Sequence, residues 1–180
     1  MPGMATIPAT GGGTEDPSAA RQLLIFQVAG QFCALRIESV REIVPMAELV
    51  RLPGQPSVLE GFLNLHGAPV AVLRLDRLFD LPAAQLSLYT PLIILKGQRN
   101  STALLVDRVD EIASAPAGAF LPAAENSCFN DCSPAQVVLD GRTIHLLSSE
   151  HLLLEKERRA VAELQTRAQR YLDELEGRAE

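Results

Sequence analysis

Short runs of apolar residues, separated by residues that favour turns, fill the middle of the chain. The runs are rich in Val, Ile, Leu and Phe, which is typical of buried strands. Two of the separating steps are X-Gly pairs, His66-Gly67 and Asp140-Gly141. A two-residue turn with Gly in its second position predicts a β-hairpin. The four predicted hairpins span residues 23–37, 62–73, 92–106 and 137–147.

One ten-residue pattern occurs twice in the chain. Residues 34–43 return as residues 103–112, 69 positions later, and an X-Gly hairpin follows each copy. Each repeat unit, with its hairpin, has about 70 residues and buries too little apolar surface to be stable alone. We therefore expect the two copies to pack against each other. Short strands with frequent turns favour small β-barrels, which leave few strand edges unpaired. The sequence therefore predicts an all-β core made of two small β-barrels side by side.

The two ends of the chain differ from this middle part. Residues 1–21 are rich in Pro, Gly and small residues, and we expect them to form a disordered tail. Closely spaced prolines in residues 45–56 predict a connecting loop. After Glu150 nothing interrupts a helical pattern until Gly177, which is well placed to end a helix.

A C-terminal α-helix is therefore expected in an extension over residues 155–180. Its apolar residues fall at 3-4-3-4 spacing, which is the spacing of a coiled-coil seam. The seam consists of Val161, Leu164, Ala168, Tyr171 and Leu175. Self-association through this seam is one interpretation, and packing of the helix on its own domain is the other.

The composition limits the classes of protein that are compatible with the chain. Of its 180 residues, 47% are hydrophobic and 21% are charged, as in ordinary globular proteins. No apolar stretch reaches the roughly 18 residues of a membrane-spanning helix, and the first residues lack the pattern of a secretory signal. We therefore expect a cytoplasmic protein without direct membrane insertion. The net charge of −6 and the lack of Trp argue against nucleic acid as a partner.

Motifs of the common enzyme classes are absent from the sequence. It contains no phosphate-binding loop, no Gly-x-Ser-x-Gly turn and no His-Glu-x-x-His motif. We therefore expect no catalysis and no cofactor. An alternative is a thiol- or metal-dependent enzyme that uses Cys128 and Cys132 with His145 or His151. The competing interpretation is that the cysteines are reduced thiols that pack as small apolar residues, as we expect for Cys33 within a strand.

Two polar features of the repeated unit are candidates for binding. His66 occupies the first turn position of a hairpin, where a side chain is displayed, but His also tolerates the unusual backbone angle beside Gly67. Glu42 and Glu111 hold equivalent positions in the two copies. Each acid can belong to a solvated face or a local salt bridge, or Glu42 can pair with the hairpin tip to shape a docking surface. The sequence leaves these interpretations open.

Several ordered motifs resemble the CheW adaptor domain of bacterial chemosensory systems. The motifs lie at residues 40–43, 52–56, 61–67, 105–112 and 139–142, and the resemblance covers about residues 22–154. It implies two five-stranded SH3-like β-barrels, and we expect lobe 1 over about residues 22–85 and lobe 2 over about residues 86–154. It also implies a non-enzymatic scaffold that couples methyl-accepting chemoreceptors to a CheA-type histidine kinase in a chemotaxis or chemosensory-like signal transduction pathway.

The resemblance also implies where partners bind. The positions that carry over to the receptor- and kinase-facing surfaces are Val40, Glu42, Gly61, Asn64 and Gly67. Three residues depart from the family pattern, since His66 and Arg74 stand where Arg and Asp are usual and Ser148 replaces a frequent Asp.

The change at His66 is the departure with the clearest physical meaning. Because His is shorter than Arg and titrates near pH ~6.5, a pair between Glu42 and His66 would be weaker than one with Arg. We hypothesise a divergent chemosensory-like pathway with its own receptor or kinase. A stand-alone small-molecule sensor that uses the crevice between the lobes is a further alternative.

Overall fold

The computed structural model describes residues 20–97, 101–122, 135–153 and 155–178. The first half of the chain forms β1 (Arg21–Val28), β2 (Gln31–Arg36), a 3-10 turn η1 (Ile37–Ser39), β3 (Val40–Pro45), β4 (Leu49–Val50), β5 (Leu59–Leu65), β6 (Ala68–Arg74) and α1 (Leu75–Leu78). The second half forms β7 (Pro91–Leu95), β8 (Thr102–Leu105), β9 (Arg108–Ala115), η2 (Ala117–Ala119), β10 (Phe120–Pro122), β11 (Ala135–Leu139), β12 (Arg142–Leu146) and α2 (Glu155–Arg178).

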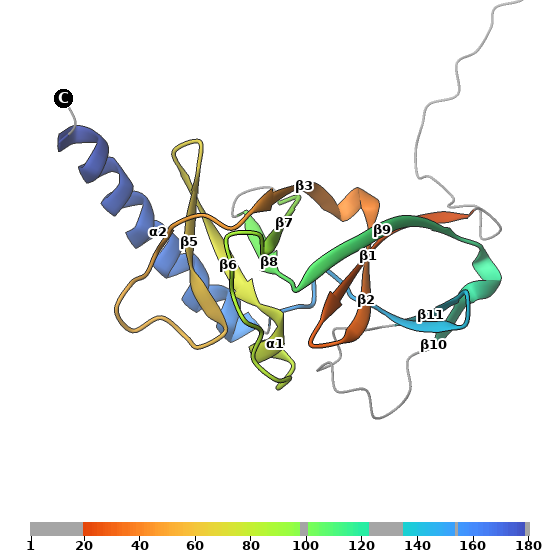
Figure 1. The fold of residues 1–180 in the computed structure, drawn as a ribbon. Coiled ribbons are helices and arrows are strands. Elements are labelled where there is room, and N and C mark those ends of the chain that lie inside the picture. The colour runs from red at the N-terminus through yellow and green to blue at the C-terminus, as the bar shows by residue number, and fades with distance from the viewer. Residues whose placement is uncertain (1–19, 98–100, 123–134, 154, 179–180) are drawn as a thin grey trace, which may run out of the picture.

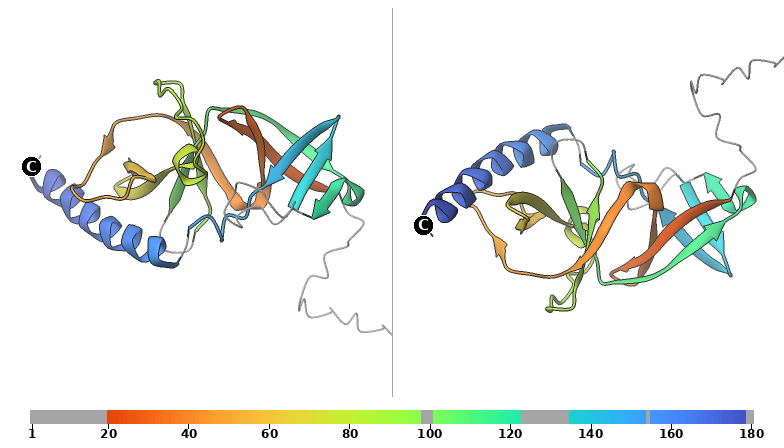
Figure 2. Two further views of the ribbon diagram at one scale, coloured as in Figure 1. Left: turned by 90° about the horizontal axis from the view of Figure 1, so that it is seen from below. Right: turned by 90° about the horizontal axis from the view of Figure 1, so that it is seen from above.

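The strands form two six-stranded sheets that have the same topology. Sheet A has the order β10-β11-β12-β2-β1-β9, and sheet B has the order β4-β5-β6-β8-β7-β3. Each sheet has one parallel pair in the middle, β12 with β2 in sheet A and β6 with β8 in sheet B. The sheets lie side by side along the long axis of the molecule, and α2 covers the outer side of sheet B (Figures 1 and 2).

The repeated ten-residue pattern is the segment that crosses from one sheet to the other. Residues 34–43 leave sheet A in β2 and enter sheet B in β3, whereas residues 103–112 leave sheet B in β8 and enter sheet A in β9. Each sheet therefore takes strands from both halves of the chain. The expected division into lobes 22–85 and 86–154 does not match the two sheets, because the halves exchange their first hairpins.

The expected barrels also need a correction. Each sheet has six strands rather than five, because the two-residue β4 and the three-residue β10 each add an edge strand. Within the described residues the edge strands of a sheet do not pair with each other, so neither sheet closes through its hydrogen bonds. The mostly β architecture with a C-terminal helix is as expected.

Three of the predicted hairpins have the turn geometry that their sequences indicate. Positive φ angles occur at both residues of Ala29-Gly30, of His66-Gly67 (54° and 86°) and of Asp140-Gly141. Two consecutive positive φ angles follow the right-handed twist of the flanking strands, which is why Gly is favoured in the second position. The turn between β7 and β8 includes residues 98–100, which lie outside the described residues.

One hydrophobic core joins the two sheets. Alternate residues of β1 face opposite ways: Leu24 and Phe26 contribute to the shared core, while Leu23 and Ile25 contribute to a cluster formed by sheet A alone. The shared core receives Phe62 and other side chains from sheet B and also side chains from α2. Sheet B has a separate cluster of its own. The expectation that the two copies pack against each other is thus met by a common core.

Helix α2 packs on its own domain with the first part of the predicted seam. Val161, Leu164 and Ala168 are buried in the shared core, whereas Tyr171 and Leu175 are exposed. None of the described helices is long and apolar enough to cross a membrane. The predicted N-terminal tail lies outside the described residues except for its end, since β1 already begins at Arg21.

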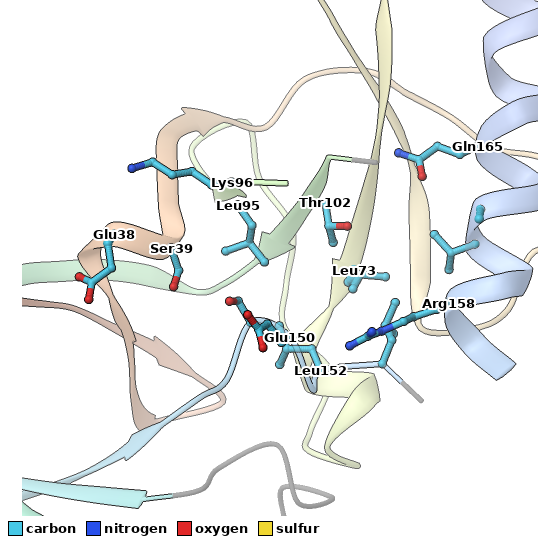
Figure 3. Close-up of a pocket in the computed structure, with 14 residues that line it drawn as sticks. Glu38, Ser39, Leu73, Leu95, Lys96, Thr102, Glu150, Leu152, Arg158 and Gln165 are labelled. Carbon is cyan, nitrogen blue, oxygen red and sulfur yellow. The ribbon is translucent and has the colours of Figure 1, made fainter. Parts of the chain in front are cut away.

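The start of α2 borders a cavity at the junction of the two sheets. The cavity has a volume of about 580 Å³ and is lined by η1, sheet B, the segment after β12 and α2. Apolar and polar side chains both line it, and four of these side chains are charged (Figure 3). These are Glu38, Lys96, Glu150 and Arg158.

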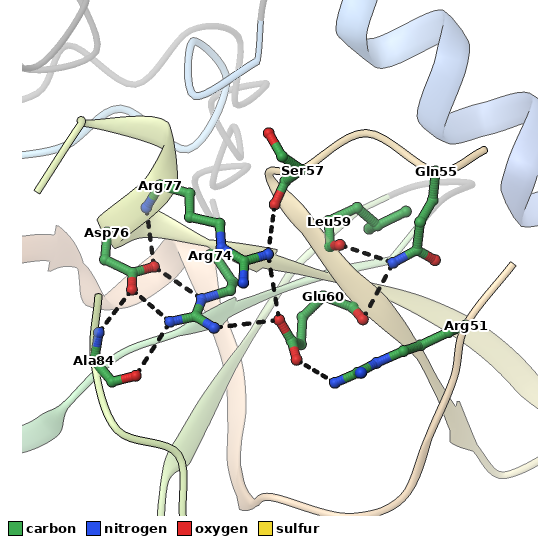
Figure 4. A network of polar contacts seen from close by, with 9 residues as sticks. All are labelled: Arg51, Gln55, Ser57, Leu59, Glu60, Arg74, Asp76, Arg77 and Ala84. Atoms are coloured by element: carbon green, nitrogen blue, oxygen red, sulfur yellow. Dashed lines mark hydrogen bonds and ion pairs between the residues drawn. The ribbon is translucent and has the colours of Figure 1, made fainter. Parts of the chain in front are cut away.

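A buried cluster of charges fixes the end of hairpin β5–β6. Arg74 is only 4% exposed and donates two hydrogen bonds to Asp76, from Nη2 to Oδ2 (2.6 Å) and from Nε to Oδ1 (3.0 Å) (Figure 4). Its Nη1 lies 3.4 Å from Oε2 of Glu60 on β5, and the other oxygen of Glu60 accepts from Arg51. Asp76 also accepts from the amides of Arg77 and Ala84. The cluster thus connects both strands of the hairpin to α1 and the loop after it.

The environment determines the charge state of this cluster. Burial by itself raises the pKa of Asp76, but the hydrogen bonds from Arg74 and from the Ala84 amide outweigh it, so the pKa lies below its usual value. The hydrogen bond to Asp76 raises the pKa of Arg74 against the opposing effect of burial. Both groups are therefore charged when the protein is folded at neutral pH.

We predict that Arg74→Ala destabilises the fold by about 3–5 kcal/mol, because it leaves Asp76 buried without its cation and removes one of the cations that pair with Glu60. Urea unfolding of the variant measures this loss. Arg41→Ala is the matched control, since Arg41 is exposed and pairs with its neighbour Glu42 only at 3.5 Å. That change should cost less than about 0.5 kcal/mol. Equal effects of the two substitutions would contradict a structural role for Arg74.

We also predict that Asp76 contributes to loss of stability in acid. Because its pKa is lower in the folded than in the unfolded protein, its stabilising effect is complete above the usual carboxyl pKa of about 3.9 and is lost as pH falls through the lower folded value. The free energy of unfolding, measured from pH 5 down to pH 2, should decrease less in Asp76→Asn than in the unchanged chain. Parallel curves would show that Asp76 is not responsible.

Candidate partner-binding surfaces

The tip of hairpin β5–β6 presents two of the predicted binding residues to solvent. Asn64 and His66 are exposed, and His66 adopts the left-handed backbone conformation with a φ of 54°. The side chain of Asn64 has a local role as well, since its Oδ1 accepts a hydrogen bond from the Gly67 amide at 2.9 Å. The two interpretations of His66 therefore both hold: the residue tolerates the turn conformation, and its imidazole is displayed.

Strand β3 carries the next two predicted residues. It is an edge strand of sheet B, with β7 as its neighbour. Val40 is half-buried and packs against the shared core, while the Glu42 side chain is 39% exposed. Ile43 beside it is also exposed. An edge strand with exposed apolar and acidic side chains is suited to contact with another protein.

Glu42 and Glu111 have different partners although they are equivalent in the repeat. The Oε1 atom of Glu111 accepts a hydrogen bond from Arg142 Nη2 at 2.8 Å, and Arg142 stacks over the ring of Phe32. Glu42 has an ion pair with its neighbour Arg41. Within the described part of the chain, no contact links Glu42 to His66. In the second copy Glu111 is thus bound by Arg142 of hairpin β11–β12, whereas in the first copy Glu42 pairs only with its neighbour Arg41.

Close packing requires glycine at position 61, which the sequence motif does not indicate. A Cβ atom at this position would lie 2.9 Å from the carbonyl oxygen of Val50 and 3.0 Å from Cβ of Leu49. The glycine therefore allows β4 to pair closely with β5. Because Gly61 is buried, its predicted part in partner binding can only be indirect, through the position of β4 and β5.

A surface that the sequence analysis did not predict lies in the loop between α1 and β7. Leu88 and Tyr89 are 76% and 91% exposed, and Leu86 and Leu88 line a hollow of about 400 Å³ next to Met46. Large apolar side chains so strongly exposed beside one another often mark a contact site for another protein. The signal in the sequence was a pair of apolar residues outside any predicted strand.

The other two departures from the family pattern lie away from these surfaces or have local partners. Arg74 belongs to the buried charge cluster, so its primary role is in the fold (Figure 4). The hydroxyl of Ser148 is 2.8 Å from Nδ1 of His151 in the segment after β12. His66 is therefore the departure whose side chain is displayed at the hairpin tip.

The residues proposed for thiol or metal chemistry are only partly described. Cys128 and Cys132 lie outside the described residues. Cys33 is buried in β2, as predicted, and burial raises the pKa of its thiol to about 12. Burial also lowers the pKa of His145, which lies opposite Cys33 in the parallel pair of β12 and β2. Among the described residues, no group of three or more potential metal ligands lies together.

Comparisons with known proteins agree with this architecture. The CheW-like domain family matches residues 22–157. The probable chemotaxis protein CheW of Rhizobium etli is 29% identical over 142 residues, which cover 78% of this chain and 92% of that protein. The chemotaxis protein CheW of Rhizobium meliloti is 26% identical, over 79% of this chain and 94% of that protein.

A solved structure shares the fold. The scaffolding protein TtCheW from Thermoanaerobacter tengcongensis superposes with a TM-score of 0.71 and is 21% identical, over 77% of this chain and 95% of that chain. The family match covers both sheets and ends within the first turn of α2. The chain therefore belongs to the family of CheW-like domains.

Proposed function

We propose that this protein is a non-enzymatic adaptor that couples methyl-accepting chemoreceptors to a CheA-type histidine kinase. The observation that carries the proposal is the match of the CheW-like family to residues 22–157, which includes every strand of both sheets. Relatives that span nearly the same region are named chemotaxis proteins. The working site of such an adaptor is the cytoplasm.

The geometry suggests that the adaptor works through fixed surfaces. Sheet B presents the edge strand β3 with Glu42 and the hairpin tip with Asn64 and His66, while the loop before β7 presents Leu88 and Tyr89. The shared core holds β3 and the hairpin β5–β6 in place relative to each other. A rigid set of separate surfaces can hold two partners at a defined distance without any chemical reaction.

Two other proposals have less support. Self-association through α2 stays a prediction, and only Tyr171 and Leu175 of its seam are exposed. A small-molecule sensor would need a crevice between the sheets, and the cavity in Figure 3 has a suitable volume and position. Ligand-dependent melting of the protein would support the sensor. The adaptor is favoured because the family match concerns the whole β region.

We predict that Glu42→Arg weakens binding to a CheA-type regulatory domain or to a receptor signalling tip by about tenfold or more, which equals about 1.4 kcal/mol. Reversing an exposed charge should affect a partner and leave the melting temperature nearly unchanged. Binding is measured by titration calorimetry with each purified partner. Glu163→Arg on the exposed face of α2 is the control for the change in net charge.

The same titrations test the proposed function itself. The unchanged protein should bind the kinase domain and the receptor tip in separate titrations, and its complex with the kinase domain should still bind the receptor tip. Failure to bind either partner, under conditions where another CheW protein binds both, would overturn the adaptor proposal. If Glu42→Arg and Glu163→Arg had equal effects, Glu42 would not belong to the binding surface.

We further predict that His66→Arg changes the choice of partner. Arg is longer and always charged, so the tip of the variant can form a two-pronged contact with a carboxylate that His66 cannot form. Pull-downs against the cognate receptor and against a receptor of a swimming pathway should show a shift of at least about threefold in their relative capture. Unchanged capture of both receptors would end the hypothesis of a divergent pathway.

A further inference from the structure

Helix α2 lies along the hairpin that carries the proposed binding tip. The helix packs against β6 and β5 (Figures 1 and 2) and runs on to Arg178, beyond residue 157, where the family match ends. Its inward face buries Leu164, Ala168 and Leu172. Most of α2 is thus an addition to the family domain, and it contacts a surface that belongs to the domain.

Gln165 connects α2 to the hairpin next to its tip, since Pro69 pairs with Asn64 there. Its side chain is 5% exposed, and its Nε2 donates hydrogen bonds to the carbonyl oxygens of Pro69 (2.9 Å) and Ser101 (3.0 Å). Pro69 lies near the start of β6, and Ser101 directly precedes β8. The parallel ladder between these strands begins at Ala71, two residues after Pro69, and at Thr102, the residue after Ser101. Gln165 therefore continues the connection between the two strands where their own pairing begins.

Gln169, one helical turn later, reaches the tip itself. Its Nε2 donates to the carbonyl oxygen of Gly67 at 3.2 Å and also to Oδ1 of Asp173 at 2.9 Å. Two turns further along, Oε1 of Glu176 lies 3.6 Å from the position that a Cβ of Gly67 would occupy. The amide of the same Gly67 donates to Asn64. The turn is thus held from inside by Asn64 and from the flank by α2.

We propose that α2 is a positioning element for the partner-binding tip, with Gln165 and Gln169 as its positioning residues. The helix fixes the direction in which His66 and Asn64 are displayed and covers one flank of the turn, so partners approach from the other side. A tip that is already ordered loses less conformational freedom on binding, which raises affinity without a new contact. This inference rests on the proposed function, because it assumes that the tip contacts a partner.

The test removes the hydrogen bond of Gln169 with little change in shape. Gln169→Met has a similar size but no donor, whereas Gln169→Lys restores a donor that can reach Gly67 and Asp173. Thr166→Val is the control for a general effect on the helix, since its hydroxyl bonds to Ala162 within α2 and it is exposed. The readout is amide hydrogen exchange by NMR at Gly67, together with affinity for the receptor tip and the kinase domain.

Gln169→Met should speed exchange of the Gly67 amide, which donates to Asn64, by about three- to tenfold, because loss of the bond from Gln169 to the Gly67 carbonyl makes opening of the turn easier. Exchange at Gly141, in the equivalent turn of sheet A, should not change. Affinity for the partner of the tip should fall by a similar factor, and Gln169→Lys should restore both values. Thr166→Val should alter neither.

Three results would overturn the inference. Unchanged exchange at Gly67 in Gln169→Met would show that α2 does not hold the tip, and equal effects of Thr166→Val would show a general loss of helix structure. Failure of the proposed function looks different. In that case exchange at Gly67 becomes faster as expected, but the unchanged protein binds neither partner, whereas binding that Gln169→Met leaves unchanged would overturn the inference alone.

Discussion

The structure depends on one constraint: the chain crosses between its two sheets at the same point of each repeat. Residues 34–43 and 103–112 each pass from one sheet to the other, so neither sheet can form from one half of the chain. The shared core, with Phe26 from β1 and Phe62 from β5, follows from this exchange. Because the two sheets are joined through buried apolar contacts, the surfaces on them keep a fixed relative position.

How far the sequence predicts this fold depends on the kind of signal. Hairpins are predicted well, because an X-Gly turn between apolar runs is a local feature, as at His66-Gly67. The division into lobes was wrong, because a repeat shows which segments are equivalent and does not show with which strands they pair. The extra edge strands were also missed, since β4 and β10 have two and three residues and no pattern of their own.

The candidate site was predicted in part for the same reason. The exposure of His66 follows from its position in a turn. The role of Gly61 is clear only from the structure, where a Cβ atom at this position would lie 2.9 Å from the carbonyl oxygen of Val50 on β4. The spacing of the helical seam does not show what the seam packs against, because Leu164 could equally face another helix or its own domain. Contacts between segments far apart in the chain settle such questions, and a single sequence contains no direct record of them.

The two departures His66 and Arg74 show how burial decides what a family difference means. Arg74 is buried, and its charge is balanced by Asp76 and Glu60 inside the protein. A partner protein therefore does not contact it. His66 is exposed at a turn that Asn64 fixes from within. A substitution at such a position changes the surface while the backbone stays the same. Partner specificity in this chain should therefore be sought at the tip of hairpin β5–β6, where Asn64 and Gln169 hold the turn through Gly67.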